Sequence, residues 1–319
     1  MWTEIKPTIA ISGCLLGQKV RFDGGHKHFR YATESLSSFF NFYPICPEVS
    51  IGLGVPRTTI RLIKGVNGAT EAVSNADQTV RYTDSLRSYG KEMAKSLDTV
   101  SGYIFKKDSP SCGVERVKIY ENDHMPPNKV GVGIYTKEII KAHPNLPVEE
   151  EGRLNDPHLR ENFLERVFTY DRWLKSRKGK FDSDALIKFH TKQKFSILAH
   201  NEESYRELGR IVAGVNNQDV EQRAQEYISL LMYAMKILIT PKNNANVLMH
   251  IMGFFKTSLT SGDKAELLRL IELHREGLVP VIVPLALINY FRKRHPNAYV
   301  DCQTYLEPHP PELMLRNML

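Results

Sequence analysis

The stretch Thr8-Ile9-Ala10-Ile11-Ser12 decides the fold of the first half of the chain. Its uninterrupted apolar run is typical of a strand that is buried on both faces, as strands in parallel sheets are. Further along, Gly102–Phe105 forms a second such run, and a long segment from about 76 to 97 carries apolar residues at helical spacing. Gly131-Val132-Gly133 then precedes another helical pattern through Ile140. This alternation predicts a Rossmann-like α/β domain with a mainly parallel sheet over residues 1–150.

From about Gly152 onward the strand patterns disappear. Asn155-Asp156-Pro157 is a strong helix start, because a capping side chain is followed by Pro in the first turn. Further helical patterns cover residues 183–200, 202–214, 219–239, 245–259, 263–275 and 284–294. The sequence therefore predicts an all-helical domain over residues 151–319. The acidic, Pro-containing stretch around His143–Gly152 is interpreted as the linker between the two domains.

The composition is that of an ordinary globular protein. The chain has 319 residues, of which 42% are hydrophobic and 25% charged, which excludes a disordered or fibrous protein and suits two domains. The formal net charge of +7 is spread over both parts. Such a charge suits a polyanionic partner such as nucleic acid, although many proteins without such a partner are equally basic.

Membrane and secretory signals are not evident in the sequence. No run of about 18 apolar residues occurs, and Met1–Pro7 lacks the pattern of a secretory signal. Four cysteines are too few for a secreted disulfide scaffold. We therefore expect a cytoplasmic protein with reduced cysteines and with no membrane or protein partner.

Three of the cysteines share one place in the predicted topology. Cys14, Cys46 and Cys112 each follow a predicted strand, which for Cys46 is the short extended run Tyr43-Pro44-Ile45. The carboxyl ends of parallel strands meet at one edge of a sheet. Gly and Pro residues flank each of them, so that backbone can approach a bulky ligand closely. Cys302 lies in the helical part without a partner motif and is interpreted as structural.

Three convergent thiolates favour one kind of metal centre. They are too few for a closed zinc site with four cysteines, but they suit an iron–sulfur cluster with one iron free of protein. Such an open iron is a Lewis acid, which favours chemistry over electron storage. The alternative is that each cysteine is a small buried hydrophobic residue.

The cysteine motifs resemble those of the TudS family of thiouracil desulfidases. The matching stretches are Ser12-Gly13-Cys14-Leu15-Leu16-Gly17, Val20-Arg21-Phe22-Asp23-Gly24, Cys46-Pro47-Glu48, Gly54-Val55-Pro56-Arg57 and Ser109-Pro110-Ser111-Cys112-Gly113. Residues 152–319 resemble the YbgA-like helical domain, through Arg153-Leu154-Asn155-Asp156, Val247-Leu248-Met249-His250 and Gly253-Phe254-Phe255-Lys256 among others. The combination is similar to the RudS type of desulfidase, which implies action on 4-thiouridine in tRNA.

The resemblance also implies a cofactor and catalytic residues. It implies a 4Fe–4S cluster with three Cys ligands, at Cys14, Cys46 and Cys112, and one open iron. It further implies a catalytic Glu48 in the Cys-Pro-Glu motif and a catalytic Ser109 in the Ser-Pro-Ser-Cys motif. The chain departs from the family pattern at Phe22, where Tyr is common, so a hydroxyl is lacking there.

The implied reaction follows from simple chemistry. A thiocarbonyl sulfur is soft, so it should bind an open cluster iron in preference to a carbonyl oxygen. Water activated by Glu48 as general base then attacks the ring carbon, while Ser109 positions the water or relays a proton. Sulfur leaves as hydrogen sulfide without net electron flow, and the lone Gly-x-Gly at Gly131–Gly133 does not indicate a dinucleotide cofactor.

Several polar residues around the predicted edge have two readings. Asp23 either forms an Asx-turn or orients the substrate, and Ser111 either caps a helix that begins near Cys112 or contacts the substrate. The cations expected at the rim are Arg57, Arg61, Lys106 and Lys107. They either hold phosphates of the RNA or form a solvated basic edge.

The leading hypothesis is a cluster-dependent desulfidase that converts 4-thiouridine in tRNA to uridine. In this hypothesis the helical domain grips the RNA, and the α/β domain accepts a base displaced from its stack. One alternative is a desulfidase of free thiouracil or of thionucleotides. The other is a non-catalytic RNA-binding or redox-sensing iron–sulfur protein.

Overall fold

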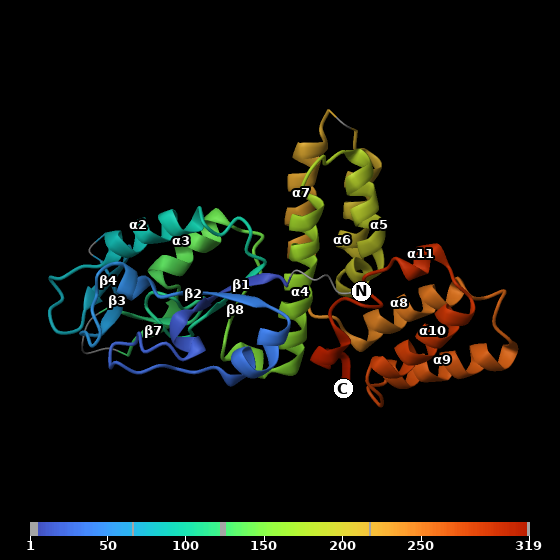
Figure 1. The fold of residues 1–319 in the computed structure, drawn as a ribbon, viewed down its shortest axis with the longest axis horizontal. Coiled ribbons are helices and arrows are strands. Elements are labelled where there is room, and N and C mark those ends of the chain that lie inside the picture. The colour runs from blue at the N-terminus through green and yellow to red at the C-terminus, as the bar shows by residue number, and fades with distance from the viewer. Residues whose placement is uncertain (1–5, 66, 122–125, 217, 318–319) are drawn as a thin grey trace. The chain divides into compact units, whose positions relative to one another are not determined.

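The computed structural model describes residues 6–65, 67–121, 126–216 and 218–317. Residues 1–5, on which the expectation about a secretory signal rests, lie outside the described residues. The chain splits into two compact units, Met1–Asn155 and Asp156–Leu319. An α/β region is followed by a helical region, so the predicted fold class is confirmed (Figure 1).

A parallel sheet forms the part of the first unit that carries the cysteines. It contains β1 (Thr8–Ser12), β2 (Asn41–Ile45), β5 (Gly102–Phe105) and β8 (Val148–Glu150) in the order β2-β1-β5-β8. All three pairings are parallel. The carboxyl ends of these strands therefore meet at one edge of the sheet, as the sequence predicts.

Burial explains the strand order. Ile9 and Ile11 of β1 and Ile104 and Phe105 of β5 are fully buried, as expected of central strands. β2 is more exposed and contains Pro44, which lacks an N–H for a further sheet pairing and so suits an edge strand.

The first unit also contains a second sheet that the sequence analysis does not predict. It consists of β3 (Ile60–Lys64), β4 (Thr70–Ser74), β6 (Val117–Tyr120) and β7 (Asn128–Gly131) in the order β4-β3-β6-β7. β3 pairs parallel with β6, whereas the two outer pairings are antiparallel. Its strands are only four or five residues long, and β3 alone alternates buried and less buried side chains, which leaves a weak periodic signal.

The helices of the first unit differ in length from the prediction. The pattern at 76–97 corresponds to α2 (Thr83–Ala94), and the one through Ile140 to α3 (Ile134–Ala142). α2 and α3 pack against each other beside the strands (Figure 1). A short π-helix (Tyr31–Ser35) and a 3-10 turn (Leu36–Ser38) precede β2, and the four-residue α1 (Pro47–Ser50) follows it.

The predicted linker is wrong. Residues 148–150 of that stretch form β8, which pairs with β5 and adds a strand to the parallel sheet. Glu149, Glu150 and Glu151 are each less than 9% exposed. Acidic residues look like a solvated linker in sequence, but here each carboxylate accepts hydrogen bonds from neighbouring groups.

The second unit is helical in all described elements. Its helices are α4 (Pro157–Ser176), α5 (Ser183–His200), α6 (Glu202–Ala213), α7 (Val220–Ala234), α8 (Pro241–Gly253), α9 (Ser261–Arg275), α10 (Ile282–Arg294) and the short α11 (Ala298–Asp301). Asp156 caps α4 through the N–H groups of His158 and Leu159, as predicted. A capping box begins α9, in which the Thr260 side chain accepts the Asp263 N–H and the Asp263 side chain accepts the Thr260 N–H. No helix among the described residues combines the length and apolar character needed to cross a bilayer.

One glycine of the first unit gives a test of the packing around Cys112. A Cβ at Gly133 would collide with the backbone of Ser111 and Cys112, whereas a Cβ at Gly209 in α6 meets nothing within 4 Å. We expect Gly133→Ala to lower the free energy of unfolding by about 1–3 kcal/mol. Gly209→Ala should raise it by about 0.5–1 kcal/mol, because alanine favours the helix. Denaturant unfolding followed by circular dichroism measures both, and equal effects of the two changes would contradict this reading.

Candidate active site

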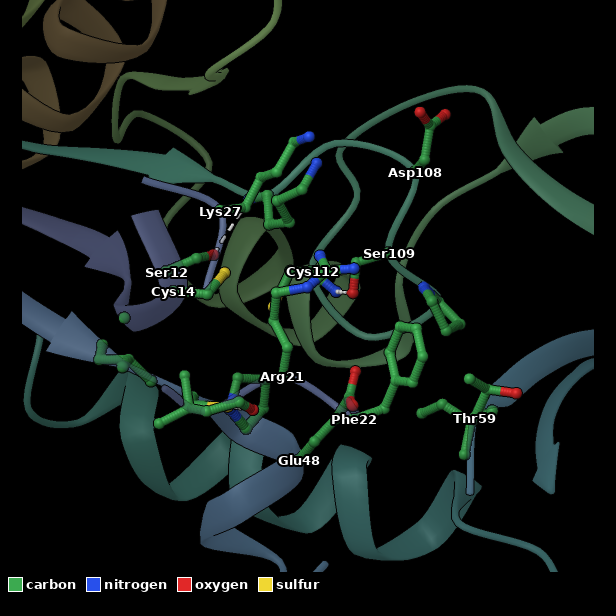
Figure 2. Close-up of a pocket in the computed structure, with 18 of the residues that line it drawn as sticks. Ser12, Cys14, Arg21, Phe22, Lys27, Glu48, Thr59, Asp108, Ser109 and Cys112 are labelled. Carbon is green, nitrogen blue, oxygen red and sulfur yellow. Dashed lines mark hydrogen bonds between the residues drawn. The ribbon is translucent and has the colours of Figure 1, made fainter. Parts of the chain in front are cut away.

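The loops that follow β1, β2 and β5 surround a cavity of about 380 Å³ in the first unit. Its walls include Cys14, Cys46 and Cys112, all of them free thiols (Figure 2). A volume of this size falls in the range of small-molecule sites. The structure thus brings together the three cysteines that the sequence predicts to converge.

Local structure fixes the position of each thiol. Cys14 lies in a 3-10 turn (Gly13–Leu16) directly after β1, and Cys46 is the N-cap residue of α1 directly after β2. Cys112 lies in a loop several residues beyond β5, where its N–H donates to the Ser109 hydroxyl oxygen at 3.0 Å. The glycine next to it, Gly113, packs against Ser109 and Val117. The space left by the missing side chain of Gly113 is therefore filled by protein atoms. The expectation that this glycine lets backbone approach a ligand is wrong.

Burial raises the pKa of all three thiols. The pKa of Cys14 is raised to about 11, mainly by burial and further by Cys46, and that of Cys46 is raised mainly by burial. The pKa of Cys112 lies well above its usual value because of burial first and then the charges of Glu48, Cys46 and Cys14. The thiols are therefore protonated near neutral pH unless a positive centre stabilises their thiolates.

Glu48 lies on the cavity wall and is held by two partners. Its Oε2 accepts hydrogen bonds from Arg57 Nη2 at 2.6 Å and Nε at 3.0 Å. Its Oε1 accepts from the Ser111 hydroxyl at 2.9 Å. The Arg57 and Glu48 side chains are only 6% and 16% exposed. The Glu48 side chain is thus held in one orientation and is largely shielded from water.

The predicted role of Arg57 in phosphate binding is wrong. A guanidinium has five N–H donors, and the described contacts of Arg57 occupy all of them. Two go to Glu48, two to the Val20 carbonyl and one to the Gly54 carbonyl. Arg57 is therefore a positioning residue for Glu48 and for the segment around Val20.

The two serines of the Cys112 loop have different roles. Ser111 is fully buried, and its hydroxyl donates to Glu48, so the predicted substrate contact is wrong. Its alternative reading as a helix cap is also wrong, because no helix begins there. Ser109 lines the cavity, and its oxygen accepts the N–H groups of Ser111 and Cys112, at 3.3 and 3.0 Å. Its hydroxyl proton can still be donated toward the cavity.

The two predicted lysines lie on the cavity wall but differ in availability. Lys106 donates to Glu151 at 2.6 Å and to the Lys107 carbonyl, and its side chain is 15% exposed. Lys107 is 48% exposed, with its ammonium 3.6 Å from Asp108. Glu151, the residue after β8, also accepts the Lys107 N–H at 2.7 Å. It therefore holds the Lys106–Lys107 part of the cavity wall in place. Lys107 is thus the better placed of the two for a phosphate.

Asp23 and Arg61 do not line the cavity. Asp23 accepts the Gly25 N–H at 3.0 Å, which is the Asx-turn of its alternative reading, and lies 3.6 Å from Arg21. Arg61 lies on β3 with its guanidinium 5.2 Å from the Tyr120 ring centroid. The Asx-turn interpretation of Asp23 is confirmed, whereas the substrate contacts of Asp23 and Arg61 stay predictions.

Several residues of the cavity wall are not among the predicted site residues. These are Arg21, Phe22, Lys27, Thr59 and Asp108 (Figure 2). Arg21 and Phe22 belong to a motif that the sequence analysis quotes, so their neighbourhood to Cys14 was a usable signal. Thr59 gives no such signal, because it enters the cavity only through the unpredicted second sheet.

The donor set fits an iron–sulfur cluster better than a single metal ion. Among the described residues, no group of three or more His, Cys, Asp or Glu side chains is arranged to hold one metal ion. A cluster carries several irons, and each iron that the protein holds takes its own thiolate, so the ligands are spread around a wider cavity. Three thiols around one cavity meet that need, and the positive charge of iron would offset the cost of their ionisation.

Comparisons with known proteins agree with this arrangement. Residues 9–151 match the family described as 2-thiouracil desulfurase, and residues 194–310 match a family of unknown function, DUF1722. The chain is 28% identical over 158 residues to the uncharacterized protein YbgA of Escherichia coli (strain K12), covering 49% of this chain and 94% of that protein. The chain is a TudS-like part joined to a YbgA-like part.

A solved structure resembles the TudS-like part. It is the [4Fe-4S]-dependent thiouracil desulfidase TudS, with 25% identity and a TM-score of 0.38, covering 47% of this chain and 95% of that one. The match of residues 9–151 to the desulfurase family supports a desulfidase activity for the TudS-like part.

The hydrogen bonds of Arg57 and Ser111 to Glu48, called the Glu48 clamp below, can be tested by measuring the free energy of unfolding. Arg57→Met leaves a buried carboxylate without its ion partner, so we expect the free energy of unfolding to fall by about 3–5 kcal/mol. Ser111→Ala should lower it by about 1–3 kcal/mol. Arg30→Met, which breaks an exposed pair with Glu34, is the control and should change it by less than about 0.5 kcal/mol. Denaturant titration measures all three, and equal losses at Arg57 and Arg30 would contradict the clamp.

Proposed function

We propose that this protein hydrolyses the carbon–sulfur bond of 4-thiouridine in tRNA, giving uridine and hydrogen sulfide. The observation that carries the proposal is the cavity itself. In a part of the chain that matches a desulfurase family, three thiols and a fixed carboxylate line one small-molecule site.

Cys14, Cys46 and Cys112 would hold a 4Fe–4S cluster in this cavity. When bound, the cluster would supply one iron free of protein ligands, a Lewis acid suited to the soft thiocarbonyl sulfur. The cysteines occupy three adjacent loops of one sheet edge, so the protein would fix the cluster against a rigid frame.

Glu48 is the general base in this proposal. Arg57 holds its Oε2, whereas Oε1 accepts only the Ser111 hydroxyl among the described contacts and has capacity for a water molecule. Glu48 takes a proton from that water as its oxygen bonds to the ring carbon, and the hydroxyl proton of Ser109 can orient the same water. The carbon–sulfur bond then breaks, and the protons of water leave with sulfur as hydrogen sulfide. No electrons are gained or lost.

The charge at the cavity mouth supports a nucleotide substrate. Lys27 and Lys107 line the cavity and are exposed, and neither donates a described hydrogen bond from its ammonium. Such lysines suit phosphate oxygens next to a base that has left its stack. The helical unit, as part of a chain with net charge +7, would add contacts to the RNA backbone.

Free 2-thiouracil is the second candidate substrate. The description of the matched family as 2-thiouracil desulfurase favours it. The same thiols and carboxylate would serve either substrate. Lys27 and Lys107, called the rim lysines below, and the helical unit would therefore determine whether tRNA or the free base is preferred.

The ligand role of the cysteines predicts a loss of iron. Cys46→Ser, purified without oxygen, should contain much less iron and sulfide than the wild type and lose its brown colour, because a serine oxygen is a poor ligand for a cluster. Cys302→Ser, in the other unit, is the matched control and should keep both. Iron and sulfide analysis measures the outcome, and full iron in Cys46→Ser would remove this residue from the ligand set.

The base role of Glu48 predicts a loss of turnover without a loss of iron. We expect Glu48→Gln to slow sulfide release from 4-thiouridine in tRNA by about 100-fold or more, since general-base catalysis contributes about 10²–10⁴-fold. Glu34→Gln, an exposed glutamate of the same unit, should be unaffected. Anaerobic incubation followed by nucleoside analysis and a sulfide assay gives the rates. Undiminished rates in Glu48→Gln would assign the proton transfer to another group.

The rim lysines decide between the two substrates. Changing Lys27 and Lys107 together to Ala should raise KM for thiolated tRNA. The slope of log affinity against log salt concentration should become smaller by about one for each phosphate contact that is lost. Turnover of free 2-thiouracil should stay the same. Lys91→Ala, an exposed lysine of α2 outside the cavity, is the control. A wild type that turns over 2-thiouracil but leaves tRNA unchanged would favour the free base.

A further inference from the structure

We propose that the Phe22 ring is the platform on which the pyrimidine ring of the substrate stacks. This inference rests on the proposed function and names the residue that recognises the aromatic ring of the substrate. Phe22 is the one aromatic side chain among the described residues that line the cavity.

The Phe22 ring is available to a ligand. It is 39% exposed although it borders a cavity, and in Figure 2 it points inward on the side where Glu48 and Ser109 lie. The Arg21 guanidinium lies 5.3 Å from its centroid, within the range of a cation–π contact. A flat apolar ring at the mouth of a cavity gains free energy when another ring covers it.

The backbone around Phe22 is held in a tight turn. Arg21 N–H donates to the Gly25 carbonyl and Gly24 N–H to the Arg21 carbonyl, at 3.2 and 3.0 Å. The Asx-turn of Asp23 closes the same turn through the Gly25 N–H. Asp23 therefore contributes to the site through the turn that presents Phe22, rather than by contact with the substrate.

Arg57 ties this turn to the catalytic carboxylate. Its backbone N–H donates to the Phe22 carbonyl at 2.9 Å, and its guanidinium donates to the Val20 carbonyl and to Glu48. One residue thus fixes both the ring and the base. A pyrimidine that stacks on Phe22 is therefore placed at a defined position relative to Glu48, which is what an attack by water on one ring carbon needs.

Phe22 has no hydroxyl, so its recognition is by shape and stacking. Stacking on an aromatic side chain tolerates any base but needs a planar aromatic ring. The platform should therefore distinguish uracil from its saturated counterpart 5,6-dihydrouracil, whose ring is not planar. This difference gives a test that does not depend on catalysis.

The test is calorimetric binding of uridine 5′-monophosphate and of 5,6-dihydrouridine 5′-monophosphate to protein purified without oxygen. We expect the wild type to bind the planar nucleotide more tightly, and Phe22→Leu to weaken its binding by about 5- to 150-fold. Binding of the saturated nucleotide should change little in this variant. Phe22→Tyr, which keeps the ring, should bind both nucleotides like the wild type.

Controls separate stacking from general damage and from the proposed function. Tyr43→Leu removes an aromatic ring of equal exposure, 39%, that lies outside the cavity, and it should leave both affinities unchanged. Equal weakening of both nucleotides in Phe22→Leu, or no weakening of either, would overturn the inference, as would a wild type without preference between them. If the wild type prefers the planar nucleotide but releases no sulfide from 4-thiouridine in tRNA, the proposed function fails while the stacking platform stands.

Discussion

The parallel pairing of β1 with β2 on one side and β5 on the other is the constraint on which the site depends. Because neighbouring parallel strands run in the same direction, the chain leaves all three at the same edge, and each exit loop carries one cysteine. The apolar side chains Ile9 and Ile11 of β1 and Ile104 and Phe105 of β5 are fully buried, so strand order and register are set by the core rather than by the site. A change of strand order would separate the thiols even if every cysteine were kept.

The cavity also brings several acidic groups close together, and neighbouring cations bind some of them. The thiols of Cys14 and Cys112 are buried and that of Cys46 is partly buried, and they lie near the carboxylates of Glu48 and Glu151. Burial is the largest cause that raises the pKa of each cysteine. Arg57 and Lys106 each bind one of these carboxylates. Arg57 and Lys106 are thus each paired with a carboxylate, whereas Lys27 and Lys107 are more exposed and donate no described hydrogen bond from their ammonium groups.

The sequence predicts those parts of the structure that repeat a strong local pattern. Long helices with caps, such as α4 and α5, and apolar central strands, such as β1 and β5, lie where the sequence predicts them. The second sheet and β8 are missed because their strands are short and half polar. Among site residues, the convergence of the cysteines follows from topology alone. The hydrogen-bond partners of Arg57 and Ser111 do not follow from topology. The bond from Ser111 to Glu48, for example, joins residues 63 positions apart and leaves no periodic pattern in the sequence.

The roles of Arg57 and Ser111 show how a site can be read wrongly from residue types alone. An arginine near a predicted anion site suggests phosphate binding, and a serine before a cysteine suggests a cap or a substrate contact. In the structure both side chains turn inward, to the same carboxylate. A general base, the role proposed for Glu48, must keep one geometry while its surroundings change charge, and a largely buried ion pair reinforced by a hydroxyl provides that rigidity. The polar residues that touch the ligand are then those that the scaffold leaves partly exposed, whereas the fully occupied ones determine where the reacting groups stand.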